Sequence, residues 1–314
     1  MHSKTPILAT ASPLLQLLML LAIIFVSLLV TALLGILLGI PFFGIGILET
    51  LTSGIDYTDN AMVPLLKYLQ IVNQLGVFVI PPLVFAFMMN WNMPAYLSLD
   101  KKPNNISWIA GGLMVLIALP FLHWLGDLNN GIRLPEFLSG VEEWMRDSEQ
   151  KAEELTELFL SVDTYPAFFV NLLMIAILPA LGEELLFRGV ILRFLKDWTG
   201  LVHFSVILSS FIFATMHFQF YGFIPRFLLG ALLGYMLVWS GTLWLPIIVH
   251  FINNGMAVLV VFIMNRQGDT AELEEIGSSS NVYYIIGSAL MMVVLTAIIY
   301  FVERKRKYPS GYFL

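Results

Sequence analysis

The sequence predicts an all-α protein, a polytopic membrane helix bundle of about eight transmembrane helices with one amphipathic helix outside the membrane. Hydrophobic residues make up 58% of the 314 residues and charged residues only 12%, and the mean hydropathy is +0.83. This composition is typical of membrane proteins rather than soluble globular domains. The net charge of −6 argues against a nucleic-acid partner. The absence of cysteine excludes disulfides and thiolate chemistry.

Eight apolar runs separated by polar loops are expected to be the membrane-spanning helices, because about 20 apolar residues suffice to cross a bilayer. They cover approximately residues 13–41, 62–91, 106–125, 167–197, 201–220, 222–239, 244–265 and 282–302. The first run is too long for a signal peptide, so we expect it to be retained as a span. Pro81 and Pro82 are expected to kink the second span.

The largest segment between spans is acidic and carries an apolar stripe at near-helical spacing, with Trp144, Leu155 and Phe159 among its members. This pattern predicts an amphipathic helix that lies on the membrane or on the bundle. A solvated helical connection is the simpler interpretation of its role, and a lid that gates a substrate is the alternative.

The chain therefore divides into four segments. They are an N-terminal three-span region (1–126), the acidic amphipathic segment (127–166), a four-span core (167–265), and an acidic loop with the last span and a basic tail (266–314). Eight spans place both termini on one side, and short basic loops prefer the cytoplasm. The basic positions near Lys4, Lys101, Lys196 and 304–307 then share one side, so we expect both termini to be cytoplasmic.

Three polar side chains in the second span, Lys67, Gln70 and Gln74, recur at spacings that place them on one helix face. Polar groups at membrane depth normally face the bundle or a cavity. A hydrogen-bonded packing stripe is the simpler interpretation of this face, and contact with a substrate is the other.

The fourth span contains two adjacent carboxylates and an arginine, Glu183, Glu184 and Arg188. Each charge inside a membrane helix costs roughly 3 kcal/mol, so three together need a structural or functional reason. Glu184 and Arg188 are four residues apart and can pair on one face. Glu183 is rotated by about 100° from that direction, which leaves it available as a general base for a water molecule.

Further polar residues lie in two other spans. His217 is near the end of the fifth span, and His250 and Asn254 share one face early in the seventh. Asn254 could orient His250 or donate a hydrogen bond to an oxyanion. Each histidine alone is more simply a packing residue, but so many buried polar groups are too costly unless they converge.

These three motifs together resemble those of the CAAX prenyl protease and bacteriocin-processing (CPBP) family of intramembrane proteases. Residues 183–188 match its Glu-Glu-x-x-x-Arg motif, residues 213–217 match Phe-x-x-x-His, and residues 250–254 match His-x-x-x-Asn. The resemblance covers about residues 167–255.

The resemblance implies a role for each catalytic candidate. Glu183 would activate the hydrolytic water with assistance from His217. Glu184 and Arg188 would organise the site. The remaining pair, His250 and Asn254, would stabilise the oxyanion.

Whether a metal takes part stays open, because the family has been described both as metalloproteases and as glutamate-dependent proteases. A divalent ion such as zinc, bound by His217, His250 and Glu183, would fit ordinary ligand chemistry. The sequence lacks a His-Glu-x-x-His motif, the strongest sequence signal for zinc, so we favour a site that requires no cofactor.

The sequence thus predicts an intramembrane endopeptidase that acts on a membrane protein or a lipidated peptide in a multi-pass bacterial plasma (inner) membrane. One alternative is a transporter that uses the same charges to relay protons or ions, although no inverted repeat is evident. The other is a non-catalytic scaffold or immunity protein of the same fold.

Overall fold

The computed structural model describes residues 5–45, 47–48, 62–268, 279 and 281–305, and in these ranges all regular structure is helical. Seven helices within the described ranges are long and apolar enough to cross a membrane, which confirms an all-α, multi-pass membrane protein. They are Pro13–Phe43, Val63–Met89, Asn105–Asn130, Tyr165–Thr199, Phe223–Ser240, Trp244–Gln267 and Val282–Arg304.

The fifth expected span is shorter than predicted. The helix α11 (Val202–Thr215) has 14 residues. At 1.5 Å per residue it is about 21 Å long, less than the roughly 30 Å hydrocarbon core of a bilayer. It packs against α12 (Phe223–Ser240), and its other face, with Phe204, Ile207 and Phe211, is exposed.

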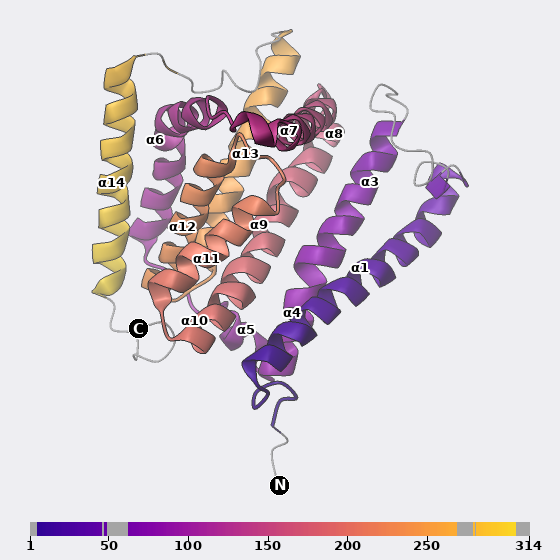
Figure 1. The fold of residues 1–314 in the computed structure, drawn as a ribbon, viewed down its shortest axis with the longest axis vertical. Helices are drawn as coiled ribbons and strands as arrows, with labels where there is room; N and C mark the ends of the chain where they lie inside the picture. The colour runs from indigo at the N-terminus through magenta and orange to yellow at the C-terminus, as the bar shows by residue number, and fades with distance from the viewer. Residues whose placement is uncertain (1–4, 46, 49–61, 269–278, 280, 306–314) are drawn as a thin grey trace.

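The remaining helices complete an up-and-down arrangement in which α1 (Pro13–Phe43) begins and α14 (Val282–Arg304) ends at the same end of the bundle (Figure 1). The helix α14 packs along α6 (Asn105–Asn130). This arrangement agrees with termini on one side, and the cytoplasmic assignment of that side stays a prediction. Lys4, Lys307 and the acidic residues Asp56 and Glu272 lie outside the described residues.

Two of the long spans contain turns that are wider than an α-helix. The second span consists of α3 (Val63–Gln74), the π-helical η2 (Leu75–Val79) and α4 (Ile80–Met89), and the expected interruption at Pro81 and Pro82 falls where η2 gives way to α4. Proline has no N–H and its ring crowds the carbonyl four residues earlier, so a wider turn relieves the conflict.

The fourth span has the same character and holds the Glu-Glu-x-x-x-Arg motif. It consists of α8 (Tyr165–Asn171), η4 (Leu172–Ile177), α9 (Leu178–Glu183), η5 (Glu184–Leu192) and α10 (Arg193–Thr199), in which η4 and η5 are π-helical. Single π-type turns inside α-helices are frequent at functional sites.

The spans carrying η2 and α9 cross closely at Gly182. A Cβ atom at Gly182 would lie 2.9 Å from Phe78 Cβ and 3.2 Å from the Phe78 carbonyl carbon. Only a residue without a side chain allows this approach, which places the following residue, Glu183, against the second span.

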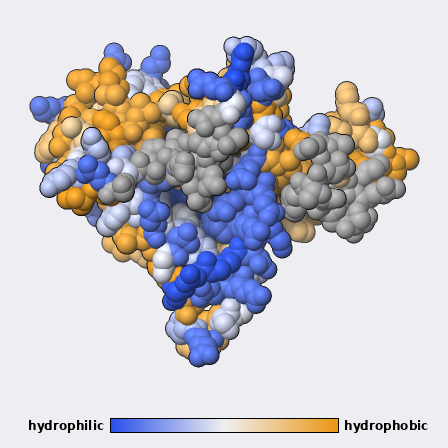
Figure 2. Space-filling view, turned by 90° about the horizontal axis from the view of Figure 1, so that it is seen from above, coloured by the Kyte–Doolittle hydropathy of each residue, from blue (hydrophilic) through white to orange (hydrophobic). Residues whose placement is uncertain are grey.

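The amphipathic helix α7 (Ser139–Leu160) lies across the upper end of the bundle (Figure 1). Seen from above, hydrophilic residues form a band across this end between hydrophobic flanks (Figure 2). Glu149 Oε2 accepts a hydrogen bond from Tyr221 N at 2.9 Å, and Asn265 Nδ2 donates to Leu160 O at 2.8 Å. The helix is therefore attached to the bundle near its middle and at its C-terminal end.

The last helix of the core, α13 (Trp244–Gln267), follows a buried turn. Thr242 and Leu243, in the turn before it, are fully buried. Thr242 Oγ1 donates to Lys101 O at 2.7 Å, and Leu243 N donates to Ser98 O at 2.9 Å. This buried turn sets the depth of every residue on α13, including His250.

Candidate active site

The expected pair of Glu184 and Arg188 forms and is almost completely buried. Arg188 Nη1 lies 2.8 Å from Glu184 Oε1, and the two side chains are 1% and 0% exposed. Arg188 Nη2 also donates to Gly230 O at 2.9 Å, and the guanidinium carbon lies 4.5 Å from the centre of the Phe213 ring. The guanidinium of Arg188 thus places a positive charge directly against the carboxylate of Glu184.

The same carboxylate oxygen also binds His250. His250 Nδ1 lies 2.9 Å from Glu184 Oε1, and the His250 side chain is 4% exposed. An ionised carboxylate can only accept, so His250 Nδ1 carries the hydrogen and donates it. His250 Nε2 is left facing Glu183, whose Oε2 is 3.9 Å away, too far for a direct hydrogen bond.

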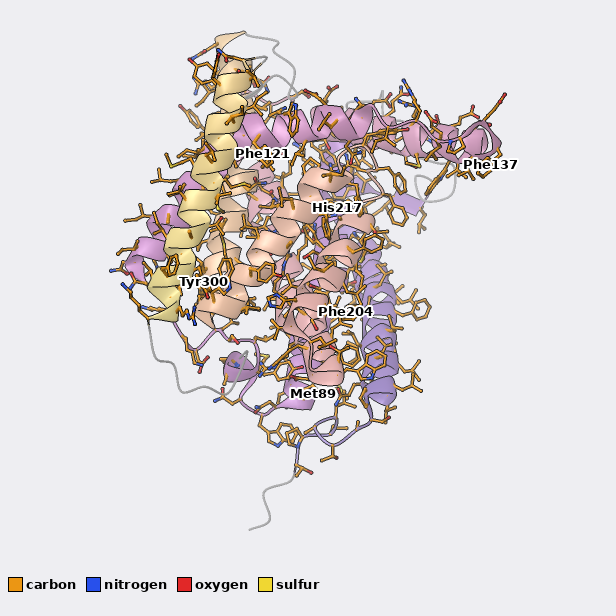
Figure 3. The ribbon with its side chains drawn as sticks, turned by 60° about the vertical axis from the view of Figure 1, so that its left-hand side comes forward. Met89, Phe121, Phe137, Phe204, His217 and Tyr300 are labelled. Carbon is orange, nitrogen blue, oxygen red and sulfur yellow. The ribbon has the colours of Figure 1, made fainter. Side chains whose placement is uncertain are left out.

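The second histidine is held by its own backbone. His217 lies just beyond the end of α11, below α7 (Figure 3). Its Nδ1 is 2.8 Å from Phe213 O, and a carbonyl oxygen only accepts, so Nδ1 carries the hydrogen and the neutral ring has an unprotonated Nε2. The next residue, Phe218, has a φ of 52°, an unusual conformation for a bulky side chain.

Four of the six predicted site residues meet in one cavity of about 370 Å³. The cavity lies between α3, α7, α9, α12 and α13. Its polar lining consists of Gln70, Gln74, Thr156, Glu183, His217, Arg226, His250, Asn253 and Asn254. The other two predicted residues, Glu184 and Arg188, are outside this lining and contact it through His250 and Phe213.

Asn254 lines the cavity, and its hydrogen bonds go to partners other than His250. Its Nδ2 donates to Ile175 O at 3.1 Å, and its Oδ1 accepts from Asn253 Nδ2 at 3.0 Å. Pro179 lies four residues after Ile175 and has no N–H to offer that carbonyl, so the Asn254 side chain supplies a donor. Glu184, rather than Asn254, orients His250 in the described structure.

The sequence motifs do not include the cavity residues contributed by α7 and α12. Leu155, Thr156 and Phe159 of α7 cover the cavity, although a solvated connection was the simpler expectation for this helix. Arg226 of α12 lines it and donates to Gln219 Oε1 at 2.8 Å. The signal for Arg226 was its positive charge in an otherwise apolar span.

The described residues do not provide a ready metal site. No three His, Asp or Glu side chains within those ranges lie close enough together to hold one ion. The donor set of Glu183, His217 and His250 therefore does not fit a metal in this arrangement, and we derive no step through one.

The fold and the cavity define a class of protein, a multi-pass helix bundle with a buried acid–histidine site. Residues 165–256 match the family model described as "Type II CAAX prenyl endopeptidase Rce1-like". This segment contains all three motifs, and the match confirms their resemblance to those of CAAX-type intramembrane proteases.

Two curated proteins are similar to parts of the chain. "Uncharacterized protein YpbD" of Bacillus subtilis (strain 168) is 35% identical over 86 residues, which are 26% of this chain and 41% of that protein. "Uncharacterized 24.3 kDa protein" of Escherichia coli is 27% identical over 173 residues, 53% of this chain and 69% of that protein. The chain thus spans about two fifths of the length of YpbD. No solved structure matches.

Proposed function

We propose that this chain is an intramembrane endopeptidase that hydrolyses a peptide bond of a membrane-associated protein or lipidated peptide with a water activated by Glu183. The single observation that carries the proposal is the convergence of Glu183, His217 and His250 on one cavity, from three separate helical segments. The family match of residues 165–256 supports the reaction class.

In the first step, a water molecule beside Glu183 attacks the carbonyl carbon of the scissile bond. The carboxylate of Glu183 takes one proton from the water as the new C–O bond forms. His217 Nε2, unprotonated when Nδ1 donates to Phe213 O, accepts the second hydrogen of the water as a hydrogen bond and orients it. The electron pair of the carbonyl double bond moves to its oxygen.

Donors on α13 stabilise the negative oxygen. When both ring nitrogens of His250 carry a hydrogen, Nε2–H donates to the oxyanion while Nδ1–H donates to Glu184. Asn254 has a second N–H beyond the one bonded to Ile175 O, and this hydrogen is the other donor.

The intermediate then collapses with cleavage of the C–N bond. Glu183 returns its proton to the leaving nitrogen, and the products are a carboxyl group and a free amine. Glu184 and Arg188 take no proton; they fix the ring of His250 by the shared hydrogen bonds. A cavity shielded from bulk water strengthens each of these charge–dipole interactions.

The proposed setting is a bacterial plasma membrane with both termini in the cytoplasm. The apolar spans support a bilayer environment. The basic residues Lys101, between two spans, and Lys196, in α10, support the orientation.

The test measures cleavage of tagged candidate membrane proteins. These are mixed with membranes that contain the wild type, Glu183→Ala or His250→Ala. We expect cleavage by the wild type and none above background by the two variants. Equal cleavage by all three would contradict the proposal, and cleavage by none would favour a scaffold.

A further inference from the structure

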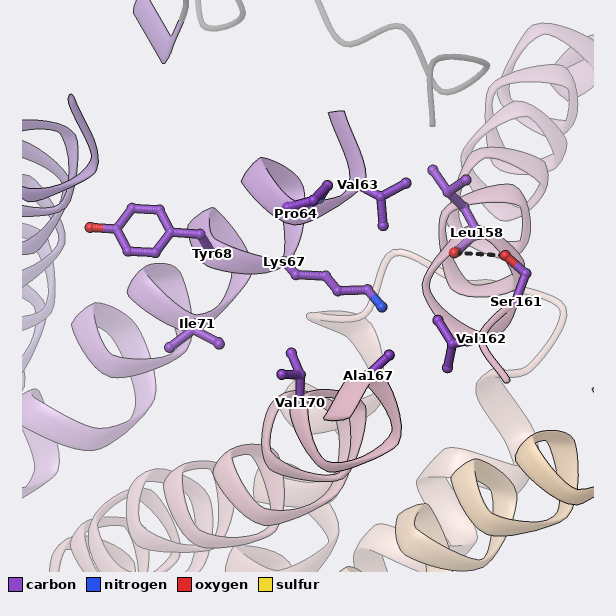
Figure 4. A pocket seen from close by; sticks show the side chains of 10 residues that line it. All are labelled: Val63, Pro64, Lys67, Tyr68, Ile71, Leu158, Ser161, Val162, Ala167 and Val170. Carbon is purple, nitrogen blue, oxygen red and sulfur yellow. Dashed lines mark hydrogen bonds between the residues drawn. The ribbon is translucent and has the colours of Figure 1, made fainter. Parts of the chain in front are cut away.

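Lys67, Gln70 and Gln74 share one face of α3, and the structure separates the first from the other two. Lys67 extends from α3 toward the end of α7 and α8 (Figure 4). Its Nζ donates to Phe159 O at 2.9 Å and to Asn171 Oδ1 at 2.7 Å. The simpler interpretation of this polar face, hydrogen-bonded packing, therefore accounts for Lys67.

Packing does not account for the two glutamines. Neither Gln70 nor Gln74 makes a side-chain hydrogen bond within the described part of the chain, and the Gln74 Oε1 atom is shielded from solvent without a donor. The Gln74 residue is only 6% exposed. A buried amide without a partner destabilises a fold, whereas a methionine of similar length would not.

Both glutamines line the cavity that contains Glu183. A primary carboxamide has two N–H donors and one acceptor oxygen, so it can pair with both the C=O and the N–H of a peptide group. In a helix those groups are already bonded to each other. Unpaired glutamines in a protease cavity therefore suit a substrate whose backbone is not helical.

The spacing of the glutamines fits an extended backbone. Four residues of an α-helix rise about 6 Å. Two residues of an extended chain span about 6.6 Å, and alternate residues present their groups on the same side. Gln70 and Gln74 can thus bond peptide groups two residues apart on one extended segment.

We propose that Gln70 and Gln74 form a subsite that binds the backbone of an extended, unwound peptide segment next to the bond attacked with the help of Glu183. This inference rests on the proposed endopeptidase function and specifies its substrate class as polypeptide that is not helical where it is cut. The two glutamines are substrate-binding residues on the wall opposite α13.

The test replaces each glutamine with methionine, which keeps the length and removes the hydrogen bonds. The parent carries Glu183→Gln so that bound peptide is not consumed. The probe is a mixture of fluorescent, unstructured peptides of randomised sequence with an acyl anchor, and its binding in detergent micelles is read by fluorescence anisotropy. We expect Gln70→Met and Gln74→Met to weaken binding about fivefold for each hydrogen bond lost.

Gln16→Met is the matched control. Gln16 Nε2 donates to Leu8 O at 3.1 Å and Ala11 O at 3.2 Å, away from the cavity. This variant should keep the affinity of the parent and lose thermal stability. Gln74→Met should show the reverse, weaker binding with a melting temperature that is unchanged or higher.

Equal affinity in all variants, or a parent that binds no peptide, would overturn the subsite. If Gln74→Met lowered the melting temperature as much as Gln16→Met, the subsite would also be overturned. Such a fall would indicate that the Gln74 side chain makes a hydrogen bond within the protein. In the active enzyme, which carries Glu183, the Gln70→Met and Gln74→Met substitutions should increase KM and leave kcat nearly unchanged. Hydrolysis by the Glu183→Gln parent would instead refute the proposed role of Glu183, and the affinity comparison would still test the glutamines.

Discussion

His250 Nδ1 lies 2.9 Å from Glu184 Oε1, so one buried hydrogen bond joins residues of two separate sequence motifs. The bond fixes which nitrogen of His250 faces Glu184 and which faces Glu183. A carboxylate in this position fixes the orientation of the ring, as in other carboxylate–histidine pairs.

Glu184→Gln should therefore reduce kcat with little change in KM. The amide removes the negative charge that Arg188 and His250 share at Oε1. It also places an N–H₂ group at the position of the buried Oε2 atom, where no hydrogen-bond partner is present in the described structure. Loss of the correct histidine tautomer in a comparable pair costs several orders of magnitude, and we expect a decrease of about a hundredfold or more.

Glu303→Gln serves as the control for Glu184→Gln. Glu303 is a buried carboxylate that accepts a hydrogen bond from Asn104 N at 2.8 Å at the end of α14. Its replacement should leave kcat within about threefold of the wild type, as expected for a change outside the site. A Glu184→Gln variant as active as this control would show that the pair does not orient His250.

Arg188→Leu should strongly destabilise the protein. The substitution leaves the carboxylate of Glu184 buried without its cation and removes the side-chain donor to Gly230 O. Removal of one partner from a buried ion pair costs about 3–5 kcal/mol in the free energy of unfolding, which chemical denaturation in detergent can measure.

A double variant separates the charge from the packing in this comparison. Arg188→Leu combined with Glu184→Leu removes both charges and should recover part of the lost free energy. Arg133→Leu breaks the exposed pair with Glu142 and should cost less than about 1 kcal/mol. A double variant less stable than Arg188→Leu alone would contradict an unpaired charge as the cause.

Gly182→Ala should lower both stability and the rate of cleavage. The new methyl group would lie 2.9 Å from Phe78 Cβ, so α9 must move away from η2 at a cost of about 1–3 kcal/mol. Glu183 is the next residue and would move with it, and displacement of a catalytic group by about 1 Å can reduce a rate a hundredfold.

Gly140→Ala is the matched control for that helix–helix approach. A Cβ atom at Gly140, near the start of α7, has no atom within 4 Å. The substitution should leave cleavage unchanged and stabilise the helix by up to about 1 kcal/mol. Similar effects of the two alanines on cleavage would show that the crossing at Gly182 does not position Glu183.

The sequence was sufficient for the features that depend on local spacing and on the cost of burying charge. The pair of Glu184 and Arg188 follows from their separation by four residues, and it forms. The convergence of Glu183, His217 and His250 followed from the cost of placing each polar group alone in a membrane, and all three line one cavity.

Features that depend on how deep each helix lies could not be predicted. The turn at Thr242 is buried and hydrogen-bonded to Lys101 O, and the helix that follows brings His250 to Glu184. The π-helical turns and the short α11 likewise follow from packing between helices rather than from the hydrophobic pattern. His250 and Asn254 are four residues apart, and that spacing suggested that they interact. The hydrogen bond from Asn254 to Ile175 O instead depends on how α13 packs against the fourth span.

The most direct test of the account is the kcat of purified wild type and Glu183→Gln on a peptide that the wild type cleaves. The amide has nearly the shape of the carboxylate but cannot take a proton from water, so the account predicts a loss of about a thousandfold or more with the free energy of unfolding little changed. A Glu183→Gln variant that is folded and retains kcat would contradict the account.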